Sequence, residues 1–537
     1  MITNIYSDKA IYTSKDEVRL IIESDGSFKG ASIEIYSLNS LNKKILLNIN
    51  EGFNSINLGQ FETKFGGFKA LLMVDGKVYS TSFTIDDDNK VIRYGFLCDF
   101  EDEESNEDVD WMNKLNINYV QFYDWGYKPN QLYSDDEVYH DLMGKKVDKN
   151  VVKEKINYCR QHSMKSMAYG PIYAADEGYY NLHKEDAYYA AKNKPLTFIE
   201  KFYFMNISLK SNWVNHIVEQ YKQCIDKMKF SGIHLDTYGY PKRAFDSMGN
   251  VCYLYDDIPI FLDYVSKELN DNSLIFNNVG AWPLGKALNF KGDAIYVEVW
   301  SPYESFYNLK EIINKCREGG KSTILAAYIA PFRLDRENAI YSALLTTFYI
   351  NTLGSTHLFL GENGCAITQG YYNDYTRLLE SELNIIKDFQ DFFVSYEELL
   401  FDETLLDVTL SNCGGDNEEY CIKGNYSLTS ESNRIAVTIR CNKRRHLISL
   451  LNLEGNNDKW NESKVEPSMS SELEFEILTF NDINAIYFAT PYMKKPQELD
   501  FSCKLGERGL IIKIVVPSFK VGMIIWFEEA LNVSSNW

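Results

Sequence analysis

Hydrophobic and polar residues follow three different patterns along the chain. Over residues 1–90, short runs such as EVRLIIES and KVYSTSFTI alternate apolar and polar residues and are broken by Gly, Asp and Asn. A period of two without helical periodicity is typical of half-buried strands. We therefore expect a small immunoglobulin-like β-sandwich in this N-terminal stretch, with DDDNK at 86–90 as a linker to the next region.

Residues 91–395 alternate apolar runs with helical patterns such as NWVNHIVEQYKQCIDKMKF. The apolar runs number eight: RYGFLCDF, NYVQFYDW, KSMAYG, GIHLDT, SLIFNNV, AIYVEVW, STILAAYI and THLFLGE. Eight buried strands, each followed by a crossover, predict a central (β/α)8 TIM barrel. The connector between the fifth and sixth runs is too short for a full helix.

Strand patterns return over residues 396–537 and predict a C-terminal antiparallel β-sandwich. The expected strands are LLDVTLSN, RIAVTIRC, RRHLISLLNL, INAIYFATP, GLIIKIVVP and GMIIWFEE. With 537 residues the chain is too long for a single core, so three domains are a natural division.

Charge and composition narrow the range of partners. The formal net charge is −21, so a nucleic acid or an anionic membrane surface is disfavoured as a partner. No run of 18 apolar residues is present, and the amino terminus has no hydrophobic signal segment, so we expect no membrane insertion. The ten cysteines form no CxxC and the histidines no HExxH, so we expect neither a metal site nor a cofactor.

The cysteines bear on the compartment. Cys98 and Cys224 lie within strand or helix patterns, where a small buried apolar residue is the usual role. So many unpatterned cysteines indicate a reducing compartment. The localisation stays open between a cytoplasmic protein and an exported one whose signal has been removed.

Polar and aromatic residues end most of the expected barrel strands, which is where a TIM barrel carries its active site. They are Tyr123, Asp124 and Trp125 on the second strand, Tyr169 on the third, Asp236 on the fourth, Asn277 and Asn278 on the fifth, Glu298 and Trp300 on the sixth, Tyr328 on the seventh and Glu362 on the eighth. Independent helix caps would account for the Asp and Asn residues, but not for Trp and Tyr beside them. We therefore expect one pocket lined by these side chains.

Asp236 and Glu298 form a candidate pair for glycoside cleavage. Two carboxylates that face each other across a pocket can divide the roles of nucleophile and acid, and a short separation predicts a retaining mechanism. His234 shares a face with Asp236 and either orients the carboxylate or fills the barrel core. The aromatic residues are expected to stack on sugar rings.

The remaining candidates each have two interpretations. Asp124 either binds a sugar hydroxyl or caps a helix, and Asn278 either donates to a sugar or belongs to a turn. Glu362 either contacts substrate or lies on a surface loop. The Tyr- and Phe-rich segment 171–204 is expected to line the cleft, with packing on the barrel wall as the alternative.

Four segments together, QFYDWGY, AYGPIYAA, GIHLDTYG and AIYVEVW, resemble glycoside hydrolase family 66. The resemblance covers residues 91–395, and the order of the flanking sandwiches is also similar. It implies that Asp236 is the nucleophile, that Glu298 is the general acid/base, and that internal α-1,6 linkages of dextran are cleaved with retention, giving isomaltooligosaccharides. Cyclising members of that family commonly carry an inserted carbohydrate-binding module, for which the interval between Tyr169 and Gly232 is too short, so we expect hydrolysis.

Three alternatives stay open. The chain could be a transglycosylase or cyclising glucanotransferase, or it could hydrolyse another α-glucan, because a barrel does not reveal linkage. A non-catalytic carbohydrate-binding protein would also use Trp125, Tyr169 and Trp300 for stacking, but it would not need both carboxylates.

Overall fold

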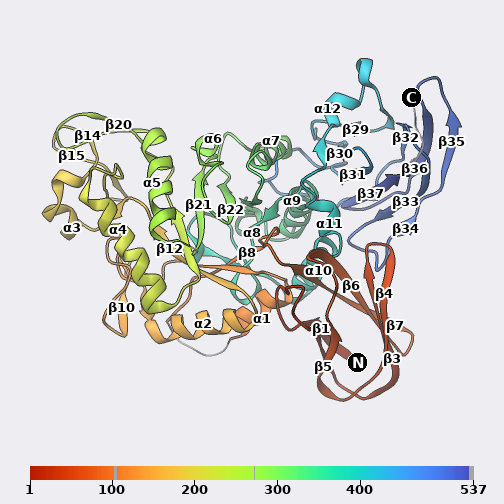
Figure 1. The fold of residues 1–537 in the computed structure, drawn as a ribbon, viewed down its shortest axis with the longest axis horizontal. Helices are drawn as coiled ribbons and strands as arrows, with labels where there is room; N and C mark the ends of the chain where they lie inside the picture. The colour runs from red at the N-terminus through yellow and green to blue at the C-terminus, as the bar shows by residue number, and fades with distance from the viewer. Residues whose placement is uncertain (102–105, 271, 531–537) are drawn as a thin grey trace.

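The computed structural model describes residues 1–101, 106–270 and 272–530, with a parallel sheet at its centre and antiparallel sheets at both ends of the chain (Figure 1). The N-terminal and C-terminal strands lie on the same side of the central sheet (Figure 1). They also touch, because the Lys495 ammonium contacts the Glu34 carboxylate at 3.2 Å.

The central sheet has eight parallel strands, so the predicted barrel strands are confirmed. They are β8 (Tyr94–Leu97), β9 (Tyr119–Phe122), β12 (Lys165–Pro171), β18 (Gly232–Asp236), β21 (Ser273–Val279), β22 (Ala294–Glu298), β23 (Ser322–Ala326) and β24 (Thr356–His357). Each pairs with its neighbours in chain order. Between β24 and β8 the gap is spanned by the Thr356 hydroxyl, which donates to the Ile92 carbonyl at 2.6 Å, so the barrel is nearly closed.

Helices connect the strands along the outside of the barrel (Figure 1). The longer ones are α1 (Glu107–Lys114), α2 (Lys149–Gln161), α4 (Asn212–Gln223), α5 (Leu254–Glu268), α7 (Phe306–Arg317) and α9 (Ala339–Thr352), and α10 (Glu380–Ser395) follows the last strand. The expected short connector between the fifth and sixth strands contains only α6 (Leu284–Ala287). The helix predicted from residue 212 ends sooner than its pattern suggests and continues as a π-helix over Cys224–Met228.

The barrel interior is filled by large side chains below the level of the strand ends. Tyr94, Tyr119, Met167, Ile275 and Tyr296 belong to one buried cluster, and each is at most 2% exposed. Layers of bulky residues make such a barrel a packed core and not a pore. Ligand space is therefore confined to the rim.

The N-terminal strands form two sheets around their own apolar core. One contains β1 (Ile2–Ser7), β2 (Val18–Ser24) and β5 (Gly52–Gly59), and the other β3 (Phe28–Ser37), β4 (Ser40–Ile49), β6 (Phe65–Val74) and β7 (Lys77–Asp86). The second sheet meets α10, where the Ser82 amide donates to the Asp391 carboxylate at 3.0 Å. The boundaries at residues 90 and 395 stay predictions.

The C-terminal strands also form two sheets. The larger has β27 (Leu406–Asp407), β30 (Ile435–Cys441), β31 (Arg445–Asn452), β37 (Gly522–Glu529), β33 (Ile483–Ala489) and β34 (Gln497–Glu498) in order, with β29 (Tyr426–Ser427) beside β30. The smaller has β28 (Tyr420–Gly424), β32 (Leu473–Thr479), β36 (Leu510–Val516) and β35 (Phe501–Leu505). The strand expected at LLDVTLSN is wrong: only β27 is extended, and Thr409–Asn412 forms the short helix α12.

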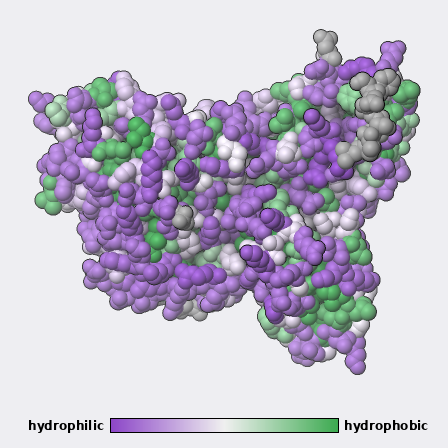
Figure 2. All heavy atoms as spheres, viewed as in Figure 1, coloured by the Kyte–Doolittle hydropathy of each residue, from purple (hydrophilic) through white to green (hydrophobic). Residues whose placement is uncertain are grey.

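The last features of the fold are the surface, the character of the helices and the state of the cysteines. Figure 2 shows a mostly hydrophilic face with hydrophobic side chains gathered over the N-terminal strands. None of the helices in the described part of the chain combines the length and apolar composition needed to span a bilayer. All ten cysteines lie among the described residues and are free thiols, and Cys98 and Cys224 are buried as predicted.

Candidate active site

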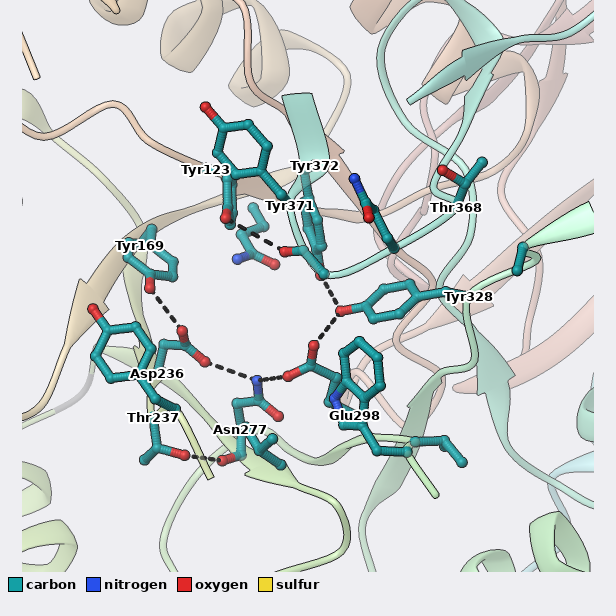
Figure 3. Close-up of a pocket in the computed structure, with 18 of the residues that line it drawn as sticks. Tyr123, Tyr169, Asp236, Thr237, Asn277, Glu298, Tyr328, Thr368, Tyr371 and Tyr372 are labelled. Atoms are coloured by element: carbon teal, nitrogen blue, oxygen red, sulfur yellow. Dashed lines mark hydrogen bonds between the residues drawn. The ribbon is translucent and has the colours of Figure 1, made fainter. Parts of the chain in front are cut away.

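A cavity of about 820 Å³ opens at the carboxyl ends of the barrel strands (Figure 3). Its volume is in the range of about 300–1,000 Å³ that is typical of ligand sites. Asp236, the last residue of β18, and Glu298, the last residue of β22, both line it. The two expected carboxylates therefore meet at the same rim of the barrel.

Asn277 joins the two carboxylates. It lies on β21, the strand between β18 and β22, and its side-chain Nδ2 donates to Asp236 Oδ1 at 2.7 Å and to Glu298 Oε2 at 2.9 Å (Figure 3). The distance between these two carboxylate oxygens therefore cannot exceed the sum of the two hydrogen-bond lengths. The shared donor fixes the spacing and orientation of both groups.

A tyrosine donates to the other oxygen of each carboxylate. The Tyr169 hydroxyl, from β12, donates to Asp236 Oδ2 at 2.7 Å, and the Tyr328 hydroxyl, just after β23, donates to Glu298 Oε1 at 2.7 Å. Behind Tyr328 the hydroxyl of Tyr372 lies 3.5 Å away. Every carboxylate oxygen of the pair thus has a protein donor, which holds both side chains in one rotamer.

Burial shifts the titration of both acids in the same direction. Desolvation raises the pKa of Asp236 to about 6, although hydrogen bonds from Tyr169 and Asn277 partly oppose it. Desolvation, and next the negative charge of Asp236, raise the pKa of Glu298 to about 7. Near pH 6.5 the site can hold one ionised and one protonated carboxyl group, which is the division that acid-and-nucleophile chemistry requires.

His234 lies at the bottom of the cavity, one pleat below Asp236. It is 1% exposed, its Nδ1 is 3.0 Å from the Tyr94 hydroxyl, and burial lowers its pKa to about 3. The imidazole is therefore neutral. No hydrogen bond joins it to Asp236 among the described residues, so its contacts are those of a residue that fills the barrel core.

Aromatic side chains form one wall of the cavity. The rings of Tyr123 and Tyr372 stack with centroids 4.4 Å apart, and Tyr371 packs edge-on against Tyr123 at 6.3 Å. The segment that carries Tyr371 and Tyr372 passes close to Glu298, because a Cβ at Gly370 would lie 3.2 Å from Glu298 Oε1. A side chain at position 370 would press on the acid.

Trp300 lies at the rim beside the same segment, because a Cβ at Gly370 would also lie 3.3 Å from its indole ring. Its indole is 42% exposed and packs edge-on against Tyr328 with centroids 5.6 Å apart. It is the one expected tryptophan that presents a free face to the cavity. Phe198 and Ile199, from the segment expected to line the cleft, also border the cavity.

Four expected site residues do not border this cavity. Trp125 is 1% exposed, and its indole N–H donates to the Tyr169 carbonyl, so it cannot stack on a ligand. Asn278 is 2% exposed and donates to the Tyr296 carbonyl at 2.9 Å. Glu362 is 1% exposed and accepts from the amides of Cys98 and Asp99.

Asp124 is the fourth. It borders a small neighbouring cavity with Asp141, and its carboxylate accepts from the Asn373 side chain at 3.0 Å. Desolvation, with the charge of Asp141 second, raises the pKa of Asp124 to about 7. Its backbone is left-handed, with φ 53°, so the strand alternation ends here.

Asn277 lines the cavity as the strand-end pattern predicts, and strand alternation explains why it does so in place of Asn278, because Ile275 two positions earlier belongs to the buried cluster inside the barrel. The structure also adds residues that the strand-end pattern does not single out. Tyr371 and Tyr372 follow the last strand at a distance. Trp460 and Asn461 come from the C-terminal region and also border the cavity.

One group of side chains outside the cavity has metal-ligand chemistry. One ligand atom from each of His183, Glu185 and Asp186 falls within 4.8 Å of the others. The Asp186 carboxylate is already engaged, because it accepts from the Ser211 hydroxyl at 2.8 Å and from the Asn212 amide at 3.0 Å. These hydrogen bonds tie Asp186 to the start of α4, where Ser211 is the N-cap residue.

Comparison with known proteins places the chain in a family. A cycloisomaltooligosaccharide glucanotransferase from Niallia circulans is 23% identical over all of this chain and 72% of its own length, and a second one from that organism is 21% identical over 85% of this chain and 64% of its own. The crystal structure of a Paenibacillus sp. cycloisomaltooligosaccharide glucanotransferase complexed with cycloisomaltoheptaose superposes with a TM-score of 0.88 at 18% identity, covering 98% of this chain and 99% of that one. Residues 7–525 match the sequence profile of Glycosyl hydrolase family 66, and the chain therefore belongs to this family.

Proposed function

We propose that this chain is a retaining enzyme that cleaves α-1,6-linked glucans and passes the cleaved chain to a sugar acceptor, with cyclisation where the acceptor is the chain's own far end. The observation that carries the proposal is the pair Asp236 and Glu298, held by Asn277 at the mouth of a ligand-sized cavity.

The carboxylate spacing supports retention. Retaining glycosidases hold their two carboxyl groups about 5–5.5 Å apart, whereas inverting enzymes need about 6.5–9.5 Å to admit a water molecule. Two hydrogen bonds of 2.7 and 2.9 Å to one nitrogen keep an oxygen of Asp236 and an oxygen of Glu298 within the shorter range. Asp236 is then the nucleophile that forms a covalent glucosyl intermediate.

The pKa order supports the assignment of roles. Asp236, with the lower pKa, is the group that ionises first and attacks the anomeric carbon. Glu298 starts protonated, donates its proton to the departing glycosidic oxygen, and then takes a proton from the incoming acceptor hydroxyl. The same residue thus serves both half-reactions.

The relatives support transfer over the dextran hydrolysis that we expected from the sequence. Both curated relatives are named as glucanotransferases, and the first aligns with the whole of this chain. The α-1,6 linkage is likewise taken from these names and from the family.

Hydrolysis of dextran is the second candidate. The alignment with the first relative extends over 713 residues, whereas this chain has 537, so that relative has segments that this chain lacks. If those segments retain the growing chain near the site, water becomes the more frequent acceptor here.

Product analysis separates these functions. We expect dextran and isomaltooligosaccharides to give cyclic or lengthened products, where a cyclic product lacks the mass of one water and has no reducing end. Release of reducing ends in step with bond cleavage would instead indicate hydrolysis. Maltooligosaccharides test the linkage, and Asp236→Asn is the inactive control; binding of glucan with no turnover in the unmodified enzyme would contradict the proposal.

A further inference from the structure

We infer that the acceptor sugar is held by a subsite shared between the barrel and the C-terminal region, with Arg333 and Asn461 as its hydrogen-bond donors. This inference rests on the proposed function. The proposed subsite lies on the part of the cavity wall that continues past Glu298, away from Asp236.

The order of the barrel strands decides which wall this is. Asp236 on β18, Asn277 on β21 and Glu298 on β22 follow one another around the rim. The nucleophile and the acid lie on opposite sides of the bond that is broken, so the leaving sugar, and later the acceptor, lie on the acid's side. Beyond Glu298 the cavity is bordered by Trp300, Ser301 and Glu304 after β22, Ala330 and Arg333 after β23, and Trp460 and Asn461.

Arg333 is the only lysine or arginine among the described residues that border the cavity. It lies on the short helix α8 (Pro331–Leu334) and is exposed, and its guanidinium has no hydrogen-bond or ion-pair partner in the described part of the chain. A guanidinium carries five donors in a rigid fork and stays charged. An unpartnered arginine at a cavity lined with acids is well suited to bind neighbouring sugar hydroxyls.

Asn461 reaches the cavity on a segment that is firmly attached to the barrel. The Trp460 amide donates to the Glu304 carbonyl at 3.1 Å, its indole donates to the Tyr303 carbonyl at 2.8 Å, and the Phe306 amide donates to the Asp458 carbonyl at 2.9 Å. Trp460 is 3% exposed and fills the space between the two regions. This anchor places the Asn461 amide, which also has no partner within the described residues, at the cavity.

The position of this contact explains how the C-terminal segment can contribute to the subsite. Residues 303–306 belong to the connection that follows Glu298 and contains Trp300. The C-terminal segment is therefore hydrogen-bonded to the loop that follows Glu298. Trp300, with its exposed face, supplies a stacking surface between the acid and the two donors. A sugar on this wall would stack on Trp300 and receive hydrogen bonds from Arg333 and Asn461.

The test uses a donor whose leaving group does not occupy this subsite. With α-isomaltosyl fluoride, fluoride release reports formation of the isomaltosyl-enzyme intermediate, and added isomaltotriose reports transfer of the isomaltosyl group. We expect Arg333→Ala to raise the isomaltotriose concentration for half-maximal transfer by at least ~10-fold and Asn461→Ala by about 5-fold, as expected for lost hydrogen bonds to charged and neutral donors. Fluoride release without acceptor should stay within about twofold of the unmodified enzyme.

Matched controls come from the same segments. Leu334 and Ser463 are exposed neighbours that do not border the cavity, so Leu334→Ala and Ser463→Ala should leave both readings unchanged. Thermal unfolding checks that every variant is folded. Unchanged acceptor dependence in both Arg333→Ala and Asn461→Ala overturns the inference, and so does a loss of fluoride release that equals the loss in transfer.

Failure of the proposed function has a different signature. An unmodified enzyme that releases no fluoride refutes the glucosyl-enzyme chemistry, and one that releases fluoride but only hydrolyses refutes transfer. In the second case the same wall holds the leaving sugar. Arg333→Ala should then lower kcat/KM for isomaltooligosaccharides about 10-fold and spare the fluoride donor; equal effects on both substrates would overturn the subsite.

Discussion

Replacing Asn277 by alanine removes the single group that both carboxylates share. The lost amide N–H donates to Asp236 at 2.7 Å and to Glu298 at 2.9 Å. Hydrogen bonds to charged groups contribute about 1.5–3 kcal/mol, and 1.36 kcal/mol corresponds to one pKa unit. Water that enters the vacated space recovers part of this stabilisation, so we expect each pKa to rise by about one unit.

The direction follows from which protonation state the amide stabilises. A donor favours the ionised carboxylate, and this lowers the pKa of both groups in the unmodified enzyme. The pH profile of kcat/KM should therefore be a bell between about 6 and about 7 in the unmodified enzyme, and its centre should move about one unit upward in Asn277→Ala. Loss of alignment should also lower kcat/KM at the optimum by about 10²-fold.

The assay is initial rates on an isomaltooligosaccharide from pH 4 to 9. Asn278→Ala is the matched control, because Asn278 is buried outside the cavity and donates to the Tyr296 carbonyl; it should cost about 1 kcal/mol of stability and leave the bell in place. Asn277→Ala and Asn278→Ala each also remove a buried amide oxygen that has no partner among the described residues, which offsets part of the stability that each variant loses. A bell that stays in place or moves to lower pH would refute the reasoning.

Three other substitutions test the carboxylates. Asp236→Ala should abolish turnover because it removes the proposed nucleophile. The protein should still fold, as calorimetry would show, since a desolvated carboxylate contributes little to stability. Near-normal activity would remove Asp236 from the mechanism. Glu298→Ala should lose about 10²–10⁴-fold on dextran, and azide should partly rescue an activated aryl α-glycoside as the α-glycosyl azide, whereas a β-azide would contradict retention. The Glu298 pKa is raised from 4.5 to about 7, so folding takes up a proton between these pH values, and the free energy of unfolding falls as pH rises through them. Glu298→Gln removes this titration, so its free energy of unfolding relative to the unmodified enzyme should be about 1–3 kcal/mol higher at pH 8 than at pH 4, measured by denaturant unfolding. An equal difference at both pH values would contradict this.

The strands of the barrel were predictable because each is buried on both faces. A continuous apolar run such as residues 294–297 of β22 is buried throughout and has no solvent side, and parallel strands covered by helices have this pattern. The last strand is the exception. Residues 358–360 are as apolar and as buried as the other strand segments, but only Thr356–His357 pairs with a neighbouring strand of the barrel. The strand expected at LLDVTLSN is wrong because the β-branched residues of this segment favour a strand, and tertiary context overrides that preference.

The site was half predictable, and strand geometry explains which half. Asp236 and Glu298 are the last residues of their strands, so alternation still holds there and both point inward. At Asp124 the backbone turns left-handed, so the alternation no longer places Trp125. Glu362 follows a strand that ends five residues earlier. No local pattern could place Asn461, which reaches the cavity through a contact between regions far apart in the sequence.

The two acids receive the same kinds of donor, so the donors do not set them apart. Each accepts from one tyrosine hydroxyl and from Asn277, at nearly equal distances. What separates them is the charge of Asp236, which raises the pKa of Glu298 beyond the effect of burial. In the proposed mechanism Asp236 loses that charge when it attacks the anomeric carbon, so Glu298 becomes a stronger acid at the moment when the leaving oxygen needs its proton. When the proposed intermediate breaks down, the charge returns to Asp236, and Glu298 regains affinity for the proton that it takes from the acceptor.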